Sequence, residues 1–450
     1  MTCHDVENET KEKKDLKWWQ LSLIGIGCTI GTGFFLGSSI GIKIGGSSII
    51  LILILTGFTT YIVFEALAKM AVEDPQKGSF RIYSKKAFGN WAGFSHGWTY
   101  WCSELLIMGS QLSALGIFSR YWFPKIPLWI FAAIYGVAAI LIIFIGVKIF
   151  ERLEKWMAII KIAAIMGFIV IAILVILGVI KGGLYKAQIP RDFKDWFPNG
   201  LKGTWSSLIY AFYAFGGIEI MGLMTIRLKD PKDAQKSGRV MLMILTIIYV
   251  VSLGLAIMMV PLNQFNTKES PFVIALQDYN LPYVPFILNV VLILAGFSTL
   301  VGSLFAVTSV LMNLAEEGDA PAMFAKKNKK NKKNISFPAL ILIIIGLGAS
   351  ILSALLLPKN IYEYVTTAAG LMLLYTWSLI LFSFWRLMNP KGWMQIKSII
   401  GLIMIALAVS GTLLQKTTRF GFLVSLLFLG IVIIVTIIVH FVSRKRNTAI

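Results

Sequence analysis

Four polar side chains stand inside long apolar stretches of the sequence, where each could hold a proton or bind a charged solute. They are Glu104, Gln111, Lys161 and Glu219. A charged side chain is costly to place within a membrane-length apolar segment, so its presence there indicates a functional site by default. A carboxyl group can carry a proton, an amide can hydrogen-bond a solute, and an ammonium group fixes a positive charge.

Two glycine-rich segments interrupt apolar runs that are otherwise long enough to cross a bilayer. They are 25–33 (GIGCTIGTG) and 215–219 (FGGIE). Glycine weakens a helix by about 1 kcal/mol relative to alanine, and a broken helix leaves backbone N–H and C=O groups that lipid cannot satisfy. Interrupted spans at matching places in two halves of a chain are typical of a transporter's binding site. Close helix packing through small residues is the alternative interpretation.

The elements that position these residues are membrane helices. The chain has 450 residues, of which 57% are hydrophobic and 14% charged, whereas a soluble protein has about 25% charged residues. We expect an all-α membrane protein with about 12 transmembrane helices. The expected spans lie near 18–42, 47–68, 91–119, 127–147, 153–180, 204–224, 239–261, 282–312, 336–357, 361–386, 396–414 and 420–443.

The two breaks fall in spans one and six, so five spans separate equivalent features. An odd number of spans per repeat inverts the second repeat relative to the first. We therefore expect an inverted five-plus-five helix repeat with discontinuous helices 1 and 6, plus two extra C-terminal helices. The expected divisions are a cytoplasmic tail at 1–17, one transporter domain at 18–443 and a cytoplasmic tail at 444–450. Within the domain, repeat one covers about 18–180, repeat two about 204–386, and the extra helices about 396–443.

The basic residues predict the orientation of the chain. The formal net charge is +20, and most Lys and Arg residues fall in segments that an even number of spans places in the cytoplasm together with both termini. The heaviest run, 326–333, follows span eight and is typical of a loop near anionic lipid. The sequence predicts a multi-pass protein of the plasma (inner) membrane with no secretory signal peptide, and no nucleic-acid partner.

Several motifs in order along the chain resemble the amino acid transporter family of the amino acid–polyamine–organocation superfamily. The residues that carry the likeness follow span two, the loop after span six, the ends of span eight and span ten. They are ALAKMA (66–71), Gly78-Ser79-Phe80, GWTYW (97–101), Lys229-Asp230-Pro231, Ser270-Pro271-Phe272, LAEEGDAP (314–321) and Tyr375-Thr376-Trp377. The resemblance covers 18 to about 390. It implies an inverted-repeat fold and secondary transport of amino acids, usually driven by protons.

The resemblance assigns the substrate's carboxylate to the first break. A half-helix N-terminus there offers free N–H donors and partial positive charge. The inner half-helix ends nearby, and its carbonyls suit an ammonium group. The expected substrate-binding residues of this break are Cys28, Thr29, Ile30, Gly31, Thr32 and Gly33.

The second break is expected to present carbonyls to the ammonium of a zwitterion. By resemblance, Phe215 covers the substrate as a gate; the alternative is ordinary packing. Glu219 is either a group in proton coupling or a structural hydrogen-bond partner of the broken backbone. The expected substrate-binding residues here are Ala214, Phe215, Gly216, Gly217 and Ile218.

Coupling is expected to involve charged and hydroxyl groups on spans three, five, six and eight. In sodium-independent relatives, a lysine at the position of Lys161 points its ammonium where sodium-coupled members hold an ion; the alternative is snorkelling to the interface. Hydroxyls of Ser298 and Thr299 could line that location. Glu104 and Gln111, seven residues apart, share one helix face. Relatives often have an acid at the position of Gln111, and the amide disfavours a cationic substrate unless Glu104 substitutes.

We therefore expect a bacterial amino acid permease, not an enzyme, that takes up an L-amino acid by alternating access, with protons as coupling ion. An amino acid exchanger or an amino-acid sensor is the alternative. The 3 Cys and 3 His residues show no metal spacing, so no metal and no cofactor are expected.

Overall fold

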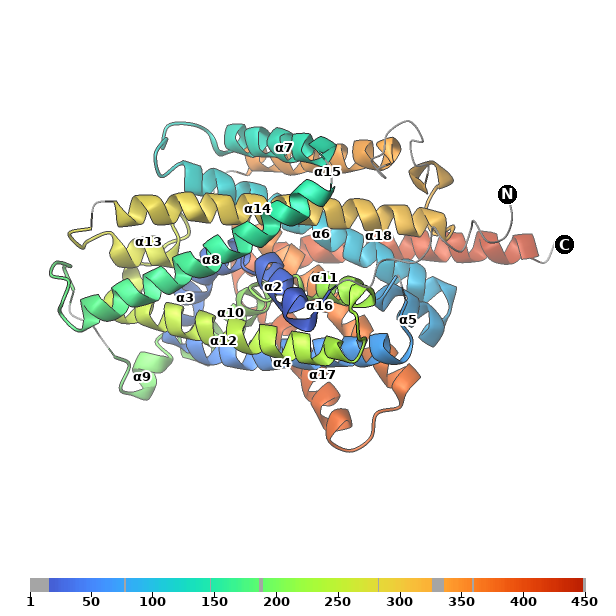
Figure 1. The fold of residues 1–450 in the computed structure, drawn as a ribbon, viewed down its shortest axis with the longest axis horizontal. Helices are drawn as coiled ribbons and strands as arrows, with labels where there is room; N and C mark the ends of the chain where they lie inside the picture. Colours follow the sequence, from blue (N-terminus) through green and yellow to red (C-terminus); the bar gives the residue numbers. More distant parts are fainter. Residues whose placement is uncertain are drawn as a thin grey trace.

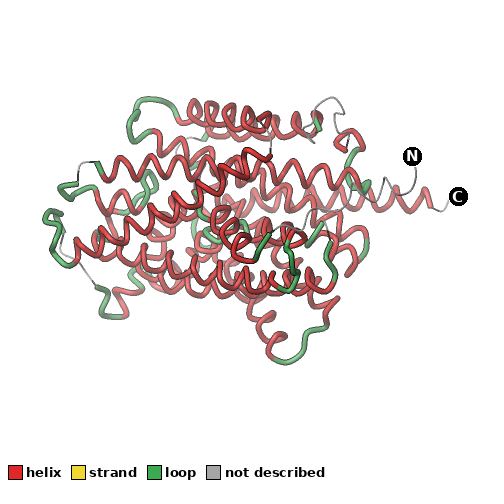
Figure 2. Tube along the Cα trace, in the orientation of Figure 1, coloured by secondary structure: helices red, strands yellow, loops and turns green. Residues whose placement is uncertain are grey.

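The computed structural model describes residues 16–447 except 77, 146, 186–188, 282, 326–335 and 358–359. These residues form helices joined by short loops, with two isolated β-bridges and no named strand in the described part of the chain (Figure 2). Most of the tail expected at 1–17, the last three residues of the tail expected at 444–450, and the basic run 326–333 lie outside the described residues.

Ten long helices make up most of the molecule. They are α4 (Ile49–Glu73), α6 (Asn90–Ser119), α7 (Leu128–Ile145), α8 (Val147–Ile176), α12 (Asp233–Met259), α14 (Val284–Glu316), α15 (Phe337–Leu356), α16 (Ile361–Met388), α17 (Trp393–Gly411) and α18 (Lys416–Asn447). Two further spans are helix pairs: α2 (Trp18–Thr29) with α3 (Ser38–Gly45), and α10 (Gly200–Tyr213) with α11 (Ile218–Met224).

The predicted fold class is confirmed. Ten helical stretches among the described residues are long and apolar enough to cross a membrane, and α7 adds a shorter apolar helix. Each of the twelve expected spans has a helix or a helix pair at its position. The inverted repeat and the division into repeats remain predictions.

Short helical elements lie between the long helices along the chain. They are the π-helical turn η1 (Gly33–Gly37), the 3-10 turns η2 (Gly46–Ser48), η3 (Thr225–Arg227), η4 (Leu262–Gln264) and η5 (Ala322–Ala325), and the helices α5 (Phe80–Phe88), α9 (Phe193–Trp196) and α13 (Pro271–Leu276). In Figure 1, α5 and the C-terminal end of α18 lie at one end of the molecule, and α9 and α13 lie at the opposite end.

The broken helices lie inside the bundle. Figure 1 shows α2, α3, α10 and α11 between the long helices α6 and α14 on one side and α4 and α12 on the other. The outer helices α15, α17 and α18 expose many large apolar side chains, as lipid-facing surfaces do. These three helices therefore present apolar surface at the perimeter of the bundle.

Ion pairs and backbone hydrogen bonds join separate segments at the end of the molecule that carries α5. Arg81 is buried and forms ion pairs with Glu317 and with Asp319, the latter with 2.6 Å between Nη1 and Oδ2. Leu16 accepts a hydrogen bond from the N–H of Lys229 and donates its own N–H to the carbonyl of Arg227. The segment before α2 is thus fixed to the segment after α11.

Glycine sets how closely α12 approaches α4. A Cβ built at Gly238 would overlap the Phe64 ring, whereas a Cβ at Gly254 on the same helix would lie 3.8 Å from Ile50 Cδ1. Because overpacking costs roughly 1–3 kcal/mol, Gly238→Ala is expected to lower the melting temperature of the purified protein by several degrees. The matched control Gly254→Ala is expected to leave it unchanged or raise it. Equal melting temperatures for the two variants would contradict this packing.

Candidate functional site

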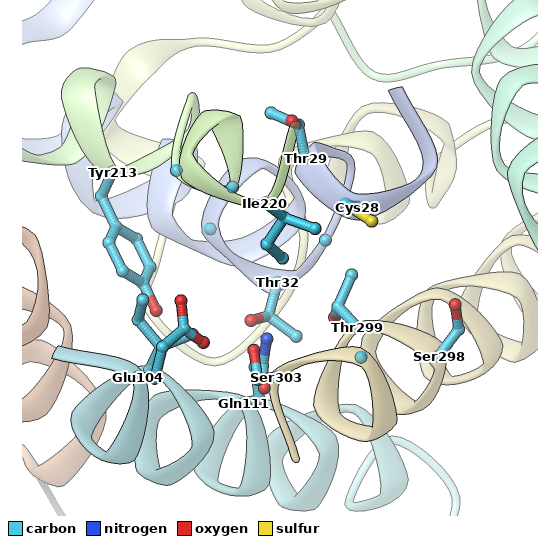
Figure 3. Close-up of a pocket in the computed structure, with 16 residues that line it drawn as sticks. Cys28, Thr29, Thr32, Glu104, Gln111, Tyr213, Ile220, Ser298, Thr299 and Ser303 are labelled. Carbon is cyan, nitrogen blue, oxygen red and sulfur yellow. The ribbon is translucent and has the colours of Figure 1, made fainter. Parts of the chain in front are cut away.

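A cavity of about 50 Å³ lies where the two breaks meet the faces of α6 and α14 (Figure 3). Its lining consists mainly of small, hydroxyl and carboxyl or amide residues. The lining residues are Cys28, Thr29, Gly31, Thr32, Gly33, Glu104, Ile107, Gln111, Tyr213, Gly216, Gly217, Ile220, Ser298, Thr299, Gly302 and Ser303. Residues from four separate segments of the chain therefore share one site.

The first break leaves backbone donors at the cavity. Helix α2 ends at Thr29, and Ile30 is extended with ψ of 100°. The N–H groups of Gly31 and Thr32 have no backbone acceptor among the described residues. The buried Thr29 hydroxyl likewise has no hydrogen-bond partner within the described part of the structure. Free N–H and O–H donors in one short segment are suited to hold an anionic group.

The second break depends on the conformation of one glycine. Gly217 has φ of 110°, in the left-handed region, where an L side chain is strained. A Cβ at this position would lie 3.3 Å from the carbonyl oxygen of Cys28. Glycine thus permits both the turn that starts α11 and the close approach of the two breaks.

Glu219 lies behind the second break rather than in the cavity lining. Its Oε2 accepts a hydrogen bond from the N–H of Gly217 at 3.0 Å, and its Oε1 accepts one from the indole N–H of Trp377 on α16. Both carboxyl oxygens therefore have N–H donors. This geometry is what the structural interpretation of Glu219 expects.

Lys161 is buried and lies against the first break. Its Nζ donates a hydrogen bond to the carbonyl oxygen of Gly27 at 2.7 Å, and its side chain is 1% exposed. A snorkelling lysine would instead place its ammonium at the membrane surface. The Lys161 ammonium group, which lies on α8, thus donates a hydrogen bond to a carbonyl near the end of α2.

One face of α6 brings a carboxyl and an amide to the cavity. Both Glu104 and Gln111 are buried, and the Oε2 of Glu104 and the Oε1 of Gln111 have no hydrogen-bond partner among the described residues. In Figure 3 the Tyr213 hydroxyl points toward the Glu104 carboxyl. The facing helix α14 supplies the hydroxyl groups of Ser298, Thr299 and Ser303.

The structure brings together most of the predicted site residues. The predicted residues that line the cavity are Cys28, Thr29, Gly31, Thr32, Gly33, Glu104, Gln111, Gly216, Gly217, Ser298 and Thr299. The predicted residues outside the lining are Ile30, Lys161, Ala214, Phe215, Ile218 and Glu219. The ring of Phe215 packs against that of Tyr249, with 5.3 Å between centroids, so its expected role as a gate stays a prediction.

Sequence reasoning missed five lining residues. They are Ile107, Tyr213, Ile220, Gly302 and Ser303. Helical spacing carried a signal for three of them, because Ile107 follows Glu104 by three positions, Gly302 follows Ser298 by four and Ser303 follows Thr299 by four. Tyr213 ends α10 directly before the second break, and nothing about its type distinguishes it from a packing aromatic.

A cavity between broken helices inside a membrane bundle is the arrangement of a membrane transporter. A sequence model of the amino acid permease family matches residues 20–446. The chain therefore belongs to the amino acid permease family, and it is a transporter rather than an enzyme. The family expected from the sequence motifs is confirmed.

Three relatives illustrate the likeness. The "Uncharacterized transporter YcgH" of Bacillus subtilis is 55% identical over 426 residues, covering 95% of each chain. The "Amino-acid permease RocC" of the same organism is 30% identical over 379 residues, covering 83% of this chain and 80% of the relative. The "Aromatic amino acid transport protein AroP" of Escherichia coli is 28% identical over 369 residues, covering 82% of this chain and 80% of the relative.

The close fit of Gly31 against α14 can be tested directly. A Cβ at Gly31 would lie 2.9 Å from Cγ2 of Thr299, whose hydroxyl is already bonded to the Gly296 carbonyl. Gly31→Ala must therefore displace a residue of the cavity wall. We expect substrate affinity to fall at least tenfold, or about 1.4 kcal/mol, in a binding assay on purified protein.

Gly37→Ala is the matched control for this prediction. Its Cβ would lie 3.6 Å from the Tyr362 hydroxyl, which is an ordinary contact. We expect this variant to bind as the unmodified protein does. Unchanged affinity in Gly31→Ala would contradict a substrate site at the first break.

Proposed function

We propose that this permease takes up an L-amino acid across the plasma membrane by alternating access, coupled to protons, with both termini in the cytoplasm. The observation that carries the proposal is the group of buried polar atoms at the cavity that lack partners among the described residues. They are the Thr29 hydroxyl, one oxygen each of Glu104 and Gln111, and the N–H groups of Gly31 and Thr32. Leaving such groups unsatisfied costs about 1–3 kcal/mol each, so a polar solute is the natural occupant.

The bound amino acid is a zwitterion, and N–H donors at one side of the cavity and oxygen acceptors at the other orient it. Its carboxylate lies at the N–H groups of the first break, where the following half-helix adds partial positive charge. Its ammonium group lies toward the carbonyls of the breaks and the Glu104 carboxyl, which is the acidic group of the lining. Opposite charges at the two ends of a small cavity would fix the direction of the bound amino acid.

The position of Lys161 favours protons over sodium ions. Its ammonium bonds the Gly27 carbonyl at the end of the inner half-helix, and a fixed positive charge a few ångströms from a would-be sodium site repels the ion. Amino acid exchange without an ion, or sensing without sustained transport, are the competing functions, and both use the same substrate contacts.

The lining also bears on the substrate's side chain. The name of one relative specifies aromatic amino acids. Here the cavity is small, its one aromatic side chain is Tyr213, and unpartnered oxygens of Glu104 and Gln111 face it. An aromatic hydrocarbon against these oxygens would leave them unsatisfied. A small side chain that donates a hydrogen bond suits the lining better.

Ion coupling is tested with proteoliposomes that contain the purified protein. An inward proton gradient is expected to raise accumulation of the labelled amino acid, and an inward Na⁺ gradient at constant pH is expected to have no effect. Steep dependence on external Na⁺ would overturn the role assigned to Lys161. Uptake that requires an unlabelled amino acid inside would identify an exchanger, and binding without uptake would identify a sensor.

Substrate choice is tested by thermal stabilisation with a panel of amino acids. We expect L-serine or L-threonine to raise the melting temperature, because their small side chains can donate a hydrogen bond to the unpartnered oxygens. We expect L-phenylalanine and L-leucine to produce no shift at equal concentration. Strongest stabilisation by an aromatic amino acid would refute the polar assignment.

A further inference from the structure

One face of α6 carries a line of buried polar side chains that extends beyond the cavity. His96, Tyr100, Glu104 and Gln111 are spaced by four, four and seven residues, so they lie on one face of the helix. All four are buried. Glu104 and Gln111 line the cavity, whereas Tyr100 and His96 continue toward the end of α6 that packs against α5.

Each member of this line has a polar atom without a hydrogen-bond partner among the described residues. These atoms are His96 Nε2, Tyr100 Oη, Glu104 Oε2 and Gln111 Oε1. The Thr376 hydroxyl on α16 also lacks a hydrogen-bond partner among the described residues. Buried polar atoms in proteins are normally hydrogen-bonded to protein or water. Water molecules would supply the missing partners, and at Tyr100 and His96 they would enter beside the Phe80 ring, which packs against both side chains.

The line continues into α5 through hydrogen-bonded hydroxyl groups. Nδ1 of His96 and Oγ of Ser84 are 2.6 Å apart, and Oγ of Ser84 and Oγ of Ser383 are 2.8 Å apart. Ser84 lies on α5, where the next residue, Lys85, is partly exposed. The hydrogen-bonded line therefore reaches the buried hydroxyl groups of Ser84 and of Ser383 on α16, at the end of the molecule that carries α5.

Charged and titratable groups from the neighbouring helices face both ends of the line. Glu104 faces Tyr100 on its own helix, Glu219 on α11 and Ser303 on α14, and Tyr213 on α10 points at it as well. At the other end, His96 faces the backbone of Thr376 and, on α5, the guanidinium of Arg81. That guanidinium is itself paired with Glu317 and Asp319.

We propose that this face of α6 conducts the coupled proton from the substrate cavity to the end of the molecule that carries α5. The inference rests on the proton coupling proposed above. It adds Tyr100, His96 and Ser84 to the residues that serve transport, although none of them lines the cavity.

The transfer can be written with O–H and N–H bonds alone. Glu104 takes up a proton from the cavity and passes it to Oη of Tyr100, which releases its own proton to a water molecule. The water delivers a proton to Nε2 of His96, and Nδ1 of the ring gives its proton to Oγ of Ser84. A second water molecule takes the Ser84 hydroxyl proton, and the His96 ring turns over so that an N–H again faces Ser84.

The other buried ionisable groups near the cavity are less suited to this task. Both oxygens of Glu219 already accept N–H donors, and Lys161 is bonded to the Gly27 carbonyl. Moving a proton through either group would disturb the backbone at a break. Tyr100 and His96 can exchange protons without changing the walls of the cavity.

The test compares two transport modes in the same proteoliposomes. His96→Gln and Tyr100→Phe are expected to lower proton-driven accumulation at least tenfold and to reduce the protons moved per amino acid, read with a pH-sensitive dye. Exchange of labelled for unlabelled amino acid is expected to stay within twofold, because exchange needs no net proton release. Retained exchange also shows that the variants are folded.

Ser113→Ala is the matched control on the opposite face of α6. Ser113 is buried, and its hydroxyl bonds the Gly109 carbonyl of its own helix. We expect this variant to keep both modes. If the unmodified protein shows no proton-driven accumulation, the coupling proposal itself fails. If it does, and both His96→Gln and Tyr100→Phe accumulate the amino acid normally, the route is refuted while proton coupling stands.

Discussion

The structure depends on satisfying the backbone groups that two helix breaks release inside a membrane. Four buried side chains, three of them from distant segments, each bond one such group. Lys161 bonds the Gly27 carbonyl, Tyr362 the Thr32 carbonyl at 2.9 Å, Tyr249 the Ala214 carbonyl at 3.2 Å, and Glu219 the N–H of Gly217. Lipid could supply none of these partners. The breaks are therefore held open by protein, and the donors that remain face the cavity.

Small residues make this arrangement compact. Gly31 lies against Thr299, and Gly217 lies against the Cys28 carbonyl. Membrane helices associate through close backbone approach rather than hydrophobic burial alone, so the glycines that weaken each helix also allow the weakened segments to touch. One residue type thus accounts for both the breaks and their proximity.

The sequence was sufficient to predict the helices, the two breaks and most residues of the cavity wall, because membrane-length apolar runs and glycine clusters are local signals. It was not sufficient to predict partners. Glu219 meets Trp377 across 158 positions, and Lys161 meets Gly27 across 134, and no local pattern encodes such pairs. Tyr213 was missed and Phe215 was expected in the lining for the same reason. Two aromatic residues two positions apart look alike in sequence, and only the turn of the backbone decides which one faces the cavity.

The π-helical turn at Gly33–Gly37 carries a consequence for the length of the chain. A π turn accommodates one residue more than an α turn, so it absorbs a single extra position between the break and α3. Removing one residue here would restore α geometry and leave the register of α3 relative to the break nearly unchanged. The turn can therefore lose one residue in length, whereas Phe34, which is buried and stacks on Tyr249, can change little in type.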